Sequence, residues 1–210
     1  VDPASLPVGL SKLMIDRLGL VDFSTIAHLR LVHLIVVDNP LRSLAGLDVH
    51  FFPVDGERNL DDFFRVQNRI SNGGRVSPEE VHTWLRNNVN STALCSHLRG
   101  HRGEFDRIVI GPYLFGLIHA VSRVAPEKTL LVPCLHDEPF ARLKASGELF
   151  NRVLRCAFNS PPERDLAVQI YGIDPGATSV VGMGLDPFES DPERFRARHA
   201  VRRKYIIYSG

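Results

Sequence analysis

Short uninterrupted apolar runs constrain the fold of this chain more than any other feature of its sequence. Most of them are continuous rather than alternating, as in strands that are buried on both faces. Segments with helical patterns lie between the later runs, and such alternation favours right-handed strand–helix–strand crossovers. The sequence therefore predicts an α/β fold with a Rossmann-like, doubly wound and mostly parallel sheet. The runs lie at 34–38, 48–54, 107–111, 128–135, 155–160, 178–184 and 205–209.

Capping residues followed by proline mark three helix starts. Ser77 is followed by proline and by Glu80, whose side chain can reach back to the cap. The segment 160–163 (SPPE) repeats this arrangement, and its helix is expected to end at Gly172. A third cap, at Ser190 or Asp191, precedes another proline. Near the N-terminus, four apolar residues fit an amphipathic helix: Leu10, Leu13, Met14 and Leu18.

Composition places the chain among soluble globular proteins and limits its partners. With 25 basic and 24 acidic side chains, the net charge of +1 gives no overall field that would attract nucleic acid. We therefore expect no nucleic-acid partner. The apolar runs are also shorter than the roughly 18–20 residues that cross a bilayer.

The three cysteines favour a reducing compartment. Cys95, Cys134 and Cys156 are odd in number and lack C-x-x-C spacing, and two of them fall within the apolar runs. Buried, reduced thiols are the expected state. The sequence therefore favours a cytoplasmic location.

The segment 130–139 (LLVPCLHDEP) is the strongest candidate for chemistry. It carries His136, Asp137 and Glu138 in succession where a predicted strand ends, and ligands of open α/β sheets bind at that edge. A histidine there can exchange a proton or bind a ligand, and carboxylates can accept hydrogen bonds from hydroxyl groups. The alternative is a polar turn that caps the next helix. A metal site is disfavoured, because consecutive strand-end residues point apart and no second His or Cys cluster has ligand spacing.

Gly111 and Tyr113 follow another predicted strand and should lie on the same edge as His136. The glycine permits close backbone approach, and the following helix start could receive an anion. The segment is not a G-x-G-x-x-G motif, so a structural turn is the alternative.

A basic cluster near the C-terminus has two interpretations. Alone it is typical of a solvated helix face, and its alternative role is contact with phosphate or a membrane surface. The cluster lacks bulky apolar anchors, so membrane association is the weaker interpretation. Its members are Arg194, Arg196, Arg198, Arg202, Arg203 and Lys204.

Four sequence segments and their order along the chain indicate a family resemblance: 105–110 (FDRIVI), 131–137 (LVPCLHD), 157–160 (AFNS) and 180–186 (VVGMGLD). Together they resemble the N-terminal half of family 4 glycosyltransferases, which are retaining, nucleotide-sugar-dependent enzymes with the two-domain GT-B fold. The last segment is similar to the family's P-N-G-V-D turn, so Gly184 and Asp186 would mark the interdomain crossover. The resemblance implies a Rossmann-like acceptor-side domain over 1–190. Residues 191–210 would form the interdomain linker and the first strand of a nucleotide-sugar-binding domain that this sequence lacks.

The same resemblance implies roles for the candidate residues. His136 would be catalytic and contact the donor sugar at the interdomain cleft. Asp137 and Glu138 would face the acceptor, with Gly111 and Tyr113 as further substrate-binding residues. No metal and no cofactor are implied.

The implied activity is transfer of a sugar from a nucleotide-sugar, held mainly by the missing domain, to a sugar, lipid-linked or small-molecule acceptor. This chain alone would then be inactive. Two alternatives stay open: a GT-B-like epimerase or phosphorylase, and a non-catalytic α/β binding module. The expected location is cytoplasmic, with peripheral contact at the inner membrane face as the alternative.

Overall fold

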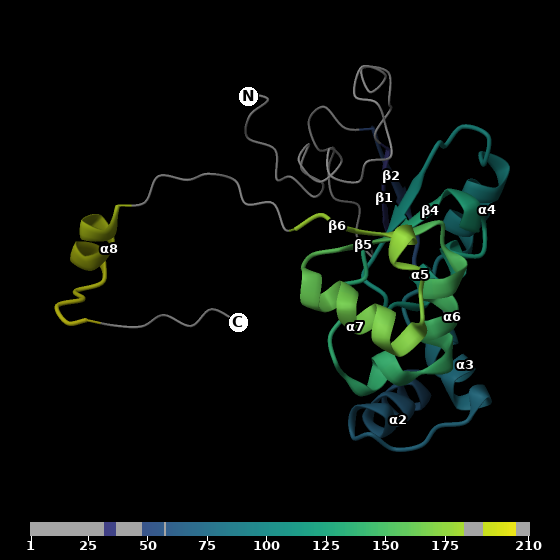
Figure 1. Cartoon of the computed structure of the whole chain (residues 1–210), viewed down its shortest axis with the longest axis horizontal. Coiled ribbons are helices and arrows are strands. Elements are labelled where there is room, and N and C mark those ends of the chain that lie inside the picture. The colour runs from purple at the N-terminus through teal and green to yellow at the C-terminus, as the bar shows by residue number, and fades with distance from the viewer. Residues whose placement is uncertain (1–31, 37–47, 57, 183–190, 205–210) are drawn as a thin grey trace.

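The computed structural model describes residues 32–36, 48–56, 58–182 and 191–204 (Figure 1). It is an α/β structure, as predicted from the apolar runs. Strands β3 (Ile108–Ile110), β4 (Thr129–Leu131), β5 (Arg155–Phe158) and β6 (Thr178–Val180) form a parallel sheet in that order. Strands β1 (Val32–Val36) and β2 (Asp48–Phe52) pair in parallel in a second sheet.

The strand order β3-β4-β5-β6 follows the chain. A doubly wound sheet requires a reversal of strand order, and the described pairings contain none. The architecture is therefore compatible with a Rossmann-like fold without showing the doubly wound topology.

Three helices connect the four parallel strands and cover one face of their sheet (Figure 1). They are α5 (Gly116–Val121), α6 (Lys144–Arg152) and α7 (Pro161–Tyr171). Because successive parallel strands are joined by right-handed crossovers, consecutive connections fall on the same side. The other described helices are α2 (Leu60–Ser71), α3 (Pro78–Arg86), α4 (Thr92–Gly100) and α8 (Pro192–Arg198), with short 3-10 turns η3 (Pro126–Lys128), η4 (Pro139–Arg142) and η5 (Pro175–Ala177).

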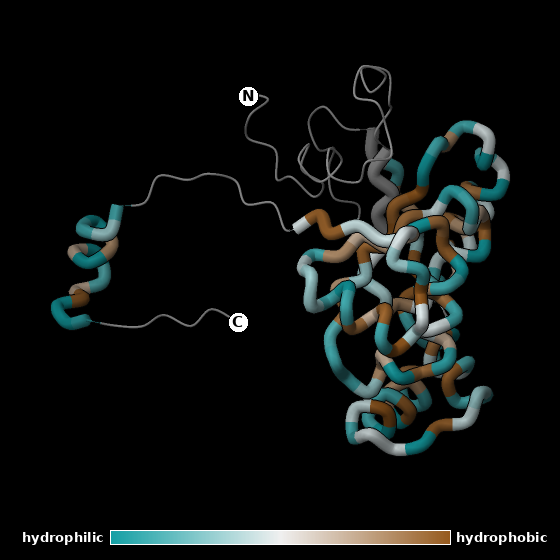
Figure 2. Tube along the Cα trace, in the orientation of Figure 1, coloured by the Kyte–Doolittle hydropathy of each residue, from teal (hydrophilic) through white to brown (hydrophobic). Residues whose placement is uncertain are grey.

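The two faces of this sheet differ in what they bury. Ile108 and Ile110 belong to the main core beneath the helices, whereas Val109 between them is 40% exposed. A smaller apolar cluster contains Leu130 and Ala157, neighbours of main-core residues on the same strands. This alternation follows from the two-residue period of a strand. Figure 2 shows hydrophobic and hydrophilic stretches alternating along the described strands and helices.

The predicted helix caps are confirmed, with one correction. Ser77 and Glu80 form the reciprocal capping box of α3, and Gly172 ends α7 with φ of 62°. Ser160 also caps α7, by accepting from the N–H of Glu163. The Glu163 carboxylate does not return to the Ser160 N–H, because it accepts hydrogen bonds from two other segments instead. The third predicted cap is Asp191, which accepts from the Arg194 N–H.

Strand β4 ends earlier than the run 128–135 predicts. Pro133 has no N–H to extend the ladder, and Cys134 has a φ of 53°, outside the strand region. Cys134 is consequently exposed, so the expectation of buried thiols is wrong for this residue. It is right for Cys95 and Cys156, which are buried.

Some predictions lie outside the described residues: the amphipathic helix around 10–18, the run 205–209, and the turn containing Gly184 and Asp186. Within the described ranges, no helix has the length and apolar character needed to cross a membrane.

Candidate functional site

The carboxyl ends of β3 and β4 approach each other closely. The Val132 N–H donates to the Ile110 carbonyl at 2.8 Å, and the Tyr113 N–H donates to the Pro133 carbonyl at 3.1 Å. A Cβ atom on Gly111 would stand 2.1 Å from the Val132 carbonyl oxygen. Glycine is therefore required at 111 by the close approach of the two backbones. The Gly111–Pro112 peptide bond is cis.

Tyr113 and Glu138 are brought together at this edge. The Tyr113 hydroxyl donates a hydrogen bond of 2.7 Å to Glu138 Oε1, and the tyrosine is 1% exposed. Burial, and next the bond to Glu138, raise the pKa of the Tyr113 phenol well above its ordinary value. The phenol therefore stays a hydrogen-bond donor. Glu138 Oε2 makes no hydrogen bond with a described residue.

His136 and Asp137 lie on the surface beside this pair. Asp137 forms an ion pair with Arg142, and both side chains are more than half exposed. The His136 side chain is exposed and makes no hydrogen bond or ion pair with a described residue. The structure therefore positions Asp137 through Arg142 and leaves the His136 imidazole open to a ligand.

Glu163 holds the ends of β4 and β5 together, a role that the sequence analysis missed. Its Oε1 accepts from the Leu135 N–H and its Oε2 from the Asn159 N–H, each at 2.7 Å. The residue is only 8% exposed, and the two charge-assisted bonds satisfy a buried carboxylate. The SPPE motif predicted that the Glu163 carboxylate belongs to the local helix cap, and it gave no sign of the contact with Leu135.

Cys134 and Asn159 add two polar groups to the same edge. The Asn159 Nδ2 approaches the Cys134 Sγ at 3.5 Å, and the thiol is exposed. With His136, these groups offer a proton-exchanging imidazole, a thiol and an amide. Such a set can bind a polar ligand and exchange a proton with it.

His119 supports the Tyr113 segment from beneath. Its Nε2 lies 3.1 Å from the Tyr113 carbonyl oxygen, while its Nδ1 is buried without a partner. Burial lowers the pKa of His119 to about 4. The neutral imidazole therefore donates from Nε2.

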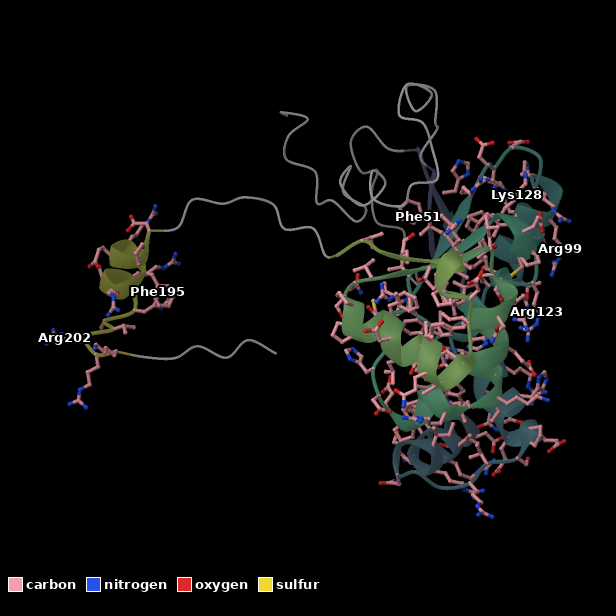
Figure 3. The ribbon with its side chains drawn as sticks, in the orientation of Figure 1. Phe51, Arg99, Arg123, Lys128, Phe195 and Arg202 are labelled. Carbon is pink, nitrogen blue, oxygen red and sulfur yellow. The ribbon has the colours of Figure 1, made fainter. Side chains whose placement is uncertain are left out.

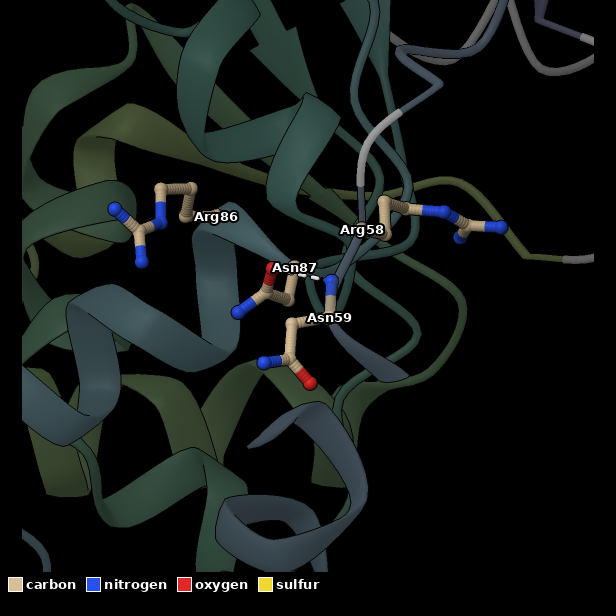
Figure 4. Close-up of a pocket in the computed structure, with 4 residues that line it drawn as sticks. All are labelled: Arg58, Asn59, Arg86 and Asn87. Atoms are coloured by element: carbon tan, nitrogen blue, oxygen red, sulfur yellow. Dashed lines mark hydrogen bonds between the residues drawn. The ribbon is translucent and has the colours of Figure 1, made fainter. Parts of the chain in front are cut away.

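Two hollows of the described surface lie away from the predicted residues. One, of about 480 Å³, is lined by Arg58, Asn59, Arg86 and Asn87 (Figure 4). Another, of about 650 Å³, lies between the η4–α6 segment and the end of α7. His136, Asp137, Glu138, Gly111 and Tyr113 line neither of them. Among the described residues, no three His, Cys, Asp or Glu side chains are grouped so as to hold a metal ion.

Comparison with known proteins identifies no relative of this chain. No family model, no curated protein and no solved structure matches the chain. The function is therefore argued from the sheet edge and its residues.

Proposed function

We propose that this chain is the acceptor-side half of a retaining GT-B glycosyltransferase. The whole enzyme would move a sugar from a nucleotide-sugar donor to a sugar, lipid-linked or small-molecule acceptor. One observation carries the proposal: the segment His136-Asp137-Glu138 stands at the carboxyl edge of the sheet, with Glu138 anchored by Tyr113. That anchor holds the segment in place and leaves His136 exposed towards a ligand.

The charges of the edge suit this chemistry. Departure of the nucleotide leaving group builds positive charge on the donor sugar, and nearby carboxylates and carbonyl dipoles stabilise it. In the proposal, His136 contacts the donor sugar, while Glu138 Oε2 accepts a hydrogen bond from an acceptor hydroxyl. Asp137, oriented by Arg142, faces the acceptor. The donor phosphates would bind mainly to a second domain of the proposed enzyme, and no metal takes part.

Transfer assays on the longer polypeptide that contains this chain test the proposal. We expect sugar transfer from one of a panel of UDP-, GDP- and ADP-hexoses, followed by product analysis. The His136→Ala variant should lower kcat on the order of 100-fold, because a positioned histidine contributes that much or more to a reaction. His82→Ala is the matched control, since His82 is an exposed histidine on α3. Undiminished transfer by His136→Ala would remove His136 from the mechanism, and no transfer from any donor would remove the proposal.

A non-catalytic binding module is the second candidate. It is favoured by the exposure of His136, whose side chain lies at the surface without a hydrogen bond to a described residue. Calorimetry with the same nucleotide-sugars on the longer polypeptide separates the two functions. Acceptor binding without donor binding or turnover would favour the module.

Peripheral membrane contact is the weaker proposal for the basic cluster. Helix α8 exposes 39% of Phe195, and Arg202 and Arg203 after the helix are exposed (Figure 3). We would expect co-sedimentation with anionic liposomes to fall when both arginines are replaced by glutamine. Unchanged co-sedimentation would count against membrane contact through this cluster.

A further inference from the structure

The start of α2 and the end of α3 form a shallow hollow of about 480 Å³ (Figure 4). Arg58 and Asn59 line it from the start of α2, and Arg86 and Asn87 from the end of α3. No motif of the sequence analysis includes these residues. None of the residues that line the hollow is proposed to take part in sugar transfer.

The side-chain amide oxygens of the hollow are occupied, and Asn59 Nδ2 donates to Asp62 Oδ2 at 2.9 Å, whereas the Asn87 amide nitrogen has no partner. Asn87 Oδ1 accepts from the Asn59 N–H at 2.9 Å, and Asn59 Oδ1 accepts from the Asp62 N–H at 3.0 Å. Asn87 Nδ2 is buried without any hydrogen-bond partner, in a residue that is 4% exposed. An unpaired buried donor is destabilising, so this amide calls for an acceptor that the described chain does not supply.

The flanking charges favour an anion as that acceptor. Neither Arg58 nor Arg86 makes an ion pair with a described residue, and in Figure 4 their side chains extend to opposite sides of Asn87. The N-terminus of α2 and the C-terminus of α3 both border the hollow, so the positive end of one helix dipole meets the negative end of the other, and the two arginines supply the favourable charge. Of the two acidic residues in the first turn of α2, neither lines the hollow, and the Asp62 carboxylate beside it is held by Arg65 at 3.0 Å and by Asn59 Nδ2 at 2.9 Å.

We propose that this hollow binds a phosphate group, either inorganic phosphate or a phosphate monoester. Asn87 Nδ2 donates to one phosphate oxygen, and the guanidinium groups of Arg58 and Arg86 rotate over the others. The exposed side chains of Asn59 and Arg86 shift to admit the ligand. Planar guanidinium groups match phosphate oxygens in charge and geometry. The proposal does not depend on the transfer activity, because its residues are different.

Heteronuclear NMR on the 210-residue chain, titrated with inorganic phosphate at constant ionic strength, tests the proposal. We expect saturable shifts of the Asn87 side-chain amide signals, which are identified by their loss in Asn87→Asp. That variant keeps the acceptor for the Asn59 N–H but replaces the donor by a negative charge. Phosphate affinity should fall more than tenfold in Asn87→Asp, and several-fold in each of Arg58→Gln and Arg86→Gln.

Two controls separate a built site from general electrostatics. Asn68→Asp places the same charge on an exposed position of α2, and Arg107→Gln removes a charge from an exposed position elsewhere. Both should bind phosphate within twofold of the unaltered chain. Equal weakening in Asn68→Asp and Asn87→Asp, or unshifted Asn87 amide signals at saturation, would overturn the proposal. A parallel titration with glycerol 3-phosphate distinguishes a monoester site from one restricted to the free ion.

Discussion

The hydroxyl of Tyr113 donates a hydrogen bond to Glu138 and so joins the loop after β3 to the loop after β4. The two residues are separated by 25 positions in the chain. Tyr113 is buried, whereas Glu138 is half-buried and keeps its second oxygen open to the surface. The buried Tyr113 therefore holds the Glu138 carboxylate in a fixed position near the surface. A substrate-binding carboxylate needs this kind of support.

Replacing Tyr113 by phenylalanine tests this anchor. We expect the free energy of unfolding to fall by about 1.5–3 kcal/mol, the typical contribution of a hydrogen bond to a charged group. Urea denaturation measures the change. In a Glu138→Gln background the same replacement should have a smaller effect, because the acceptor is then neutral. Equal losses in both backgrounds would mean that the loss comes from packing and not from the bond to a carboxylate.

Gly111→Ala tests the close approach of β3 and β4. The added Cβ would meet the Val132 carbonyl oxygen at 2.1 Å, so the strand ends must separate. We expect a loss of about 2 kcal/mol or more in the free energy of unfolding, since backbone shifts are needed to relieve the contact. Gly103→Ala is the matched control, because nothing lies within 4 Å of a Cβ there. That control should stay within about 0.5 kcal/mol of the unaltered chain, and an equally mild effect at Gly111 would contradict the packing described here.

The strands and helix caps were predictable because their signals are local. Continuous apolar runs predicted β3 to β6, and the proline after Ser77 or Ser160 marked a helix start in each case. The end of β4 was predicted too late, because the run 128–135 includes Pro133, which cannot extend the ladder, and the positive φ of Cys134 has no glycine to signal it.

The candidate site was predictable only in outline. Parallel topology placed Tyr113 and Glu138 on one edge, but their hydrogen bond depends on the relative reach of two loops. The role of Glu163 depends on N–H groups from the segments that follow β4 and β5, and the burial of Asn87 depends on how α2 meets α3. None of these contacts has a signature within a short stretch of sequence.

Glu163→Gln tests the tie between the ends of β4 and β5. The amide replaces one carboxylate oxygen by a donor, so either the Leu135 or the Asn159 N–H faces another N–H. We expect a loss of about 2–3 kcal/mol in the free energy of unfolding, because a buried donor is left unpaired. Glu104→Gln, at an exposed position where the side chain makes no hydrogen bond with a described residue, should have little effect. Amide exchange at Leu135 and Asn159 should accelerate in Glu163→Gln, and unaltered exchange at both would rule out the tie.

His119 makes the stability of the chain depend on pH. Burial lowers its pKa from 6.5 to about 4, so between these values the unfolded chain takes up a proton that the folded chain excludes. The free energy of unfolding should therefore fall as the pH drops from 7 towards 4, by up to about 1.4 kcal/mol for each pH unit within this window. Below pH 4 this contribution no longer changes. His97 acts in the same direction, because burial and its neighbour His101 lower its pKa.

The variant His119→Gln separates the contribution of this residue from that of His97. Glutamine is neutral and can still donate to the Tyr113 carbonyl, so the loss of stability between pH 7 and pH 4.5 should be smaller by about 2 kcal/mol in the variant. His82→Gln, at an exposed position, should keep the pH dependence of the unaltered chain. Urea denaturation at both pH values measures the loss of stability on acidification in the unaltered chain and in the two variants. If His119→Gln loses as much stability on acidification as the unaltered chain, His119 is not the buried neutral group described here, because a group that excludes a proton only when folded must leave that signature.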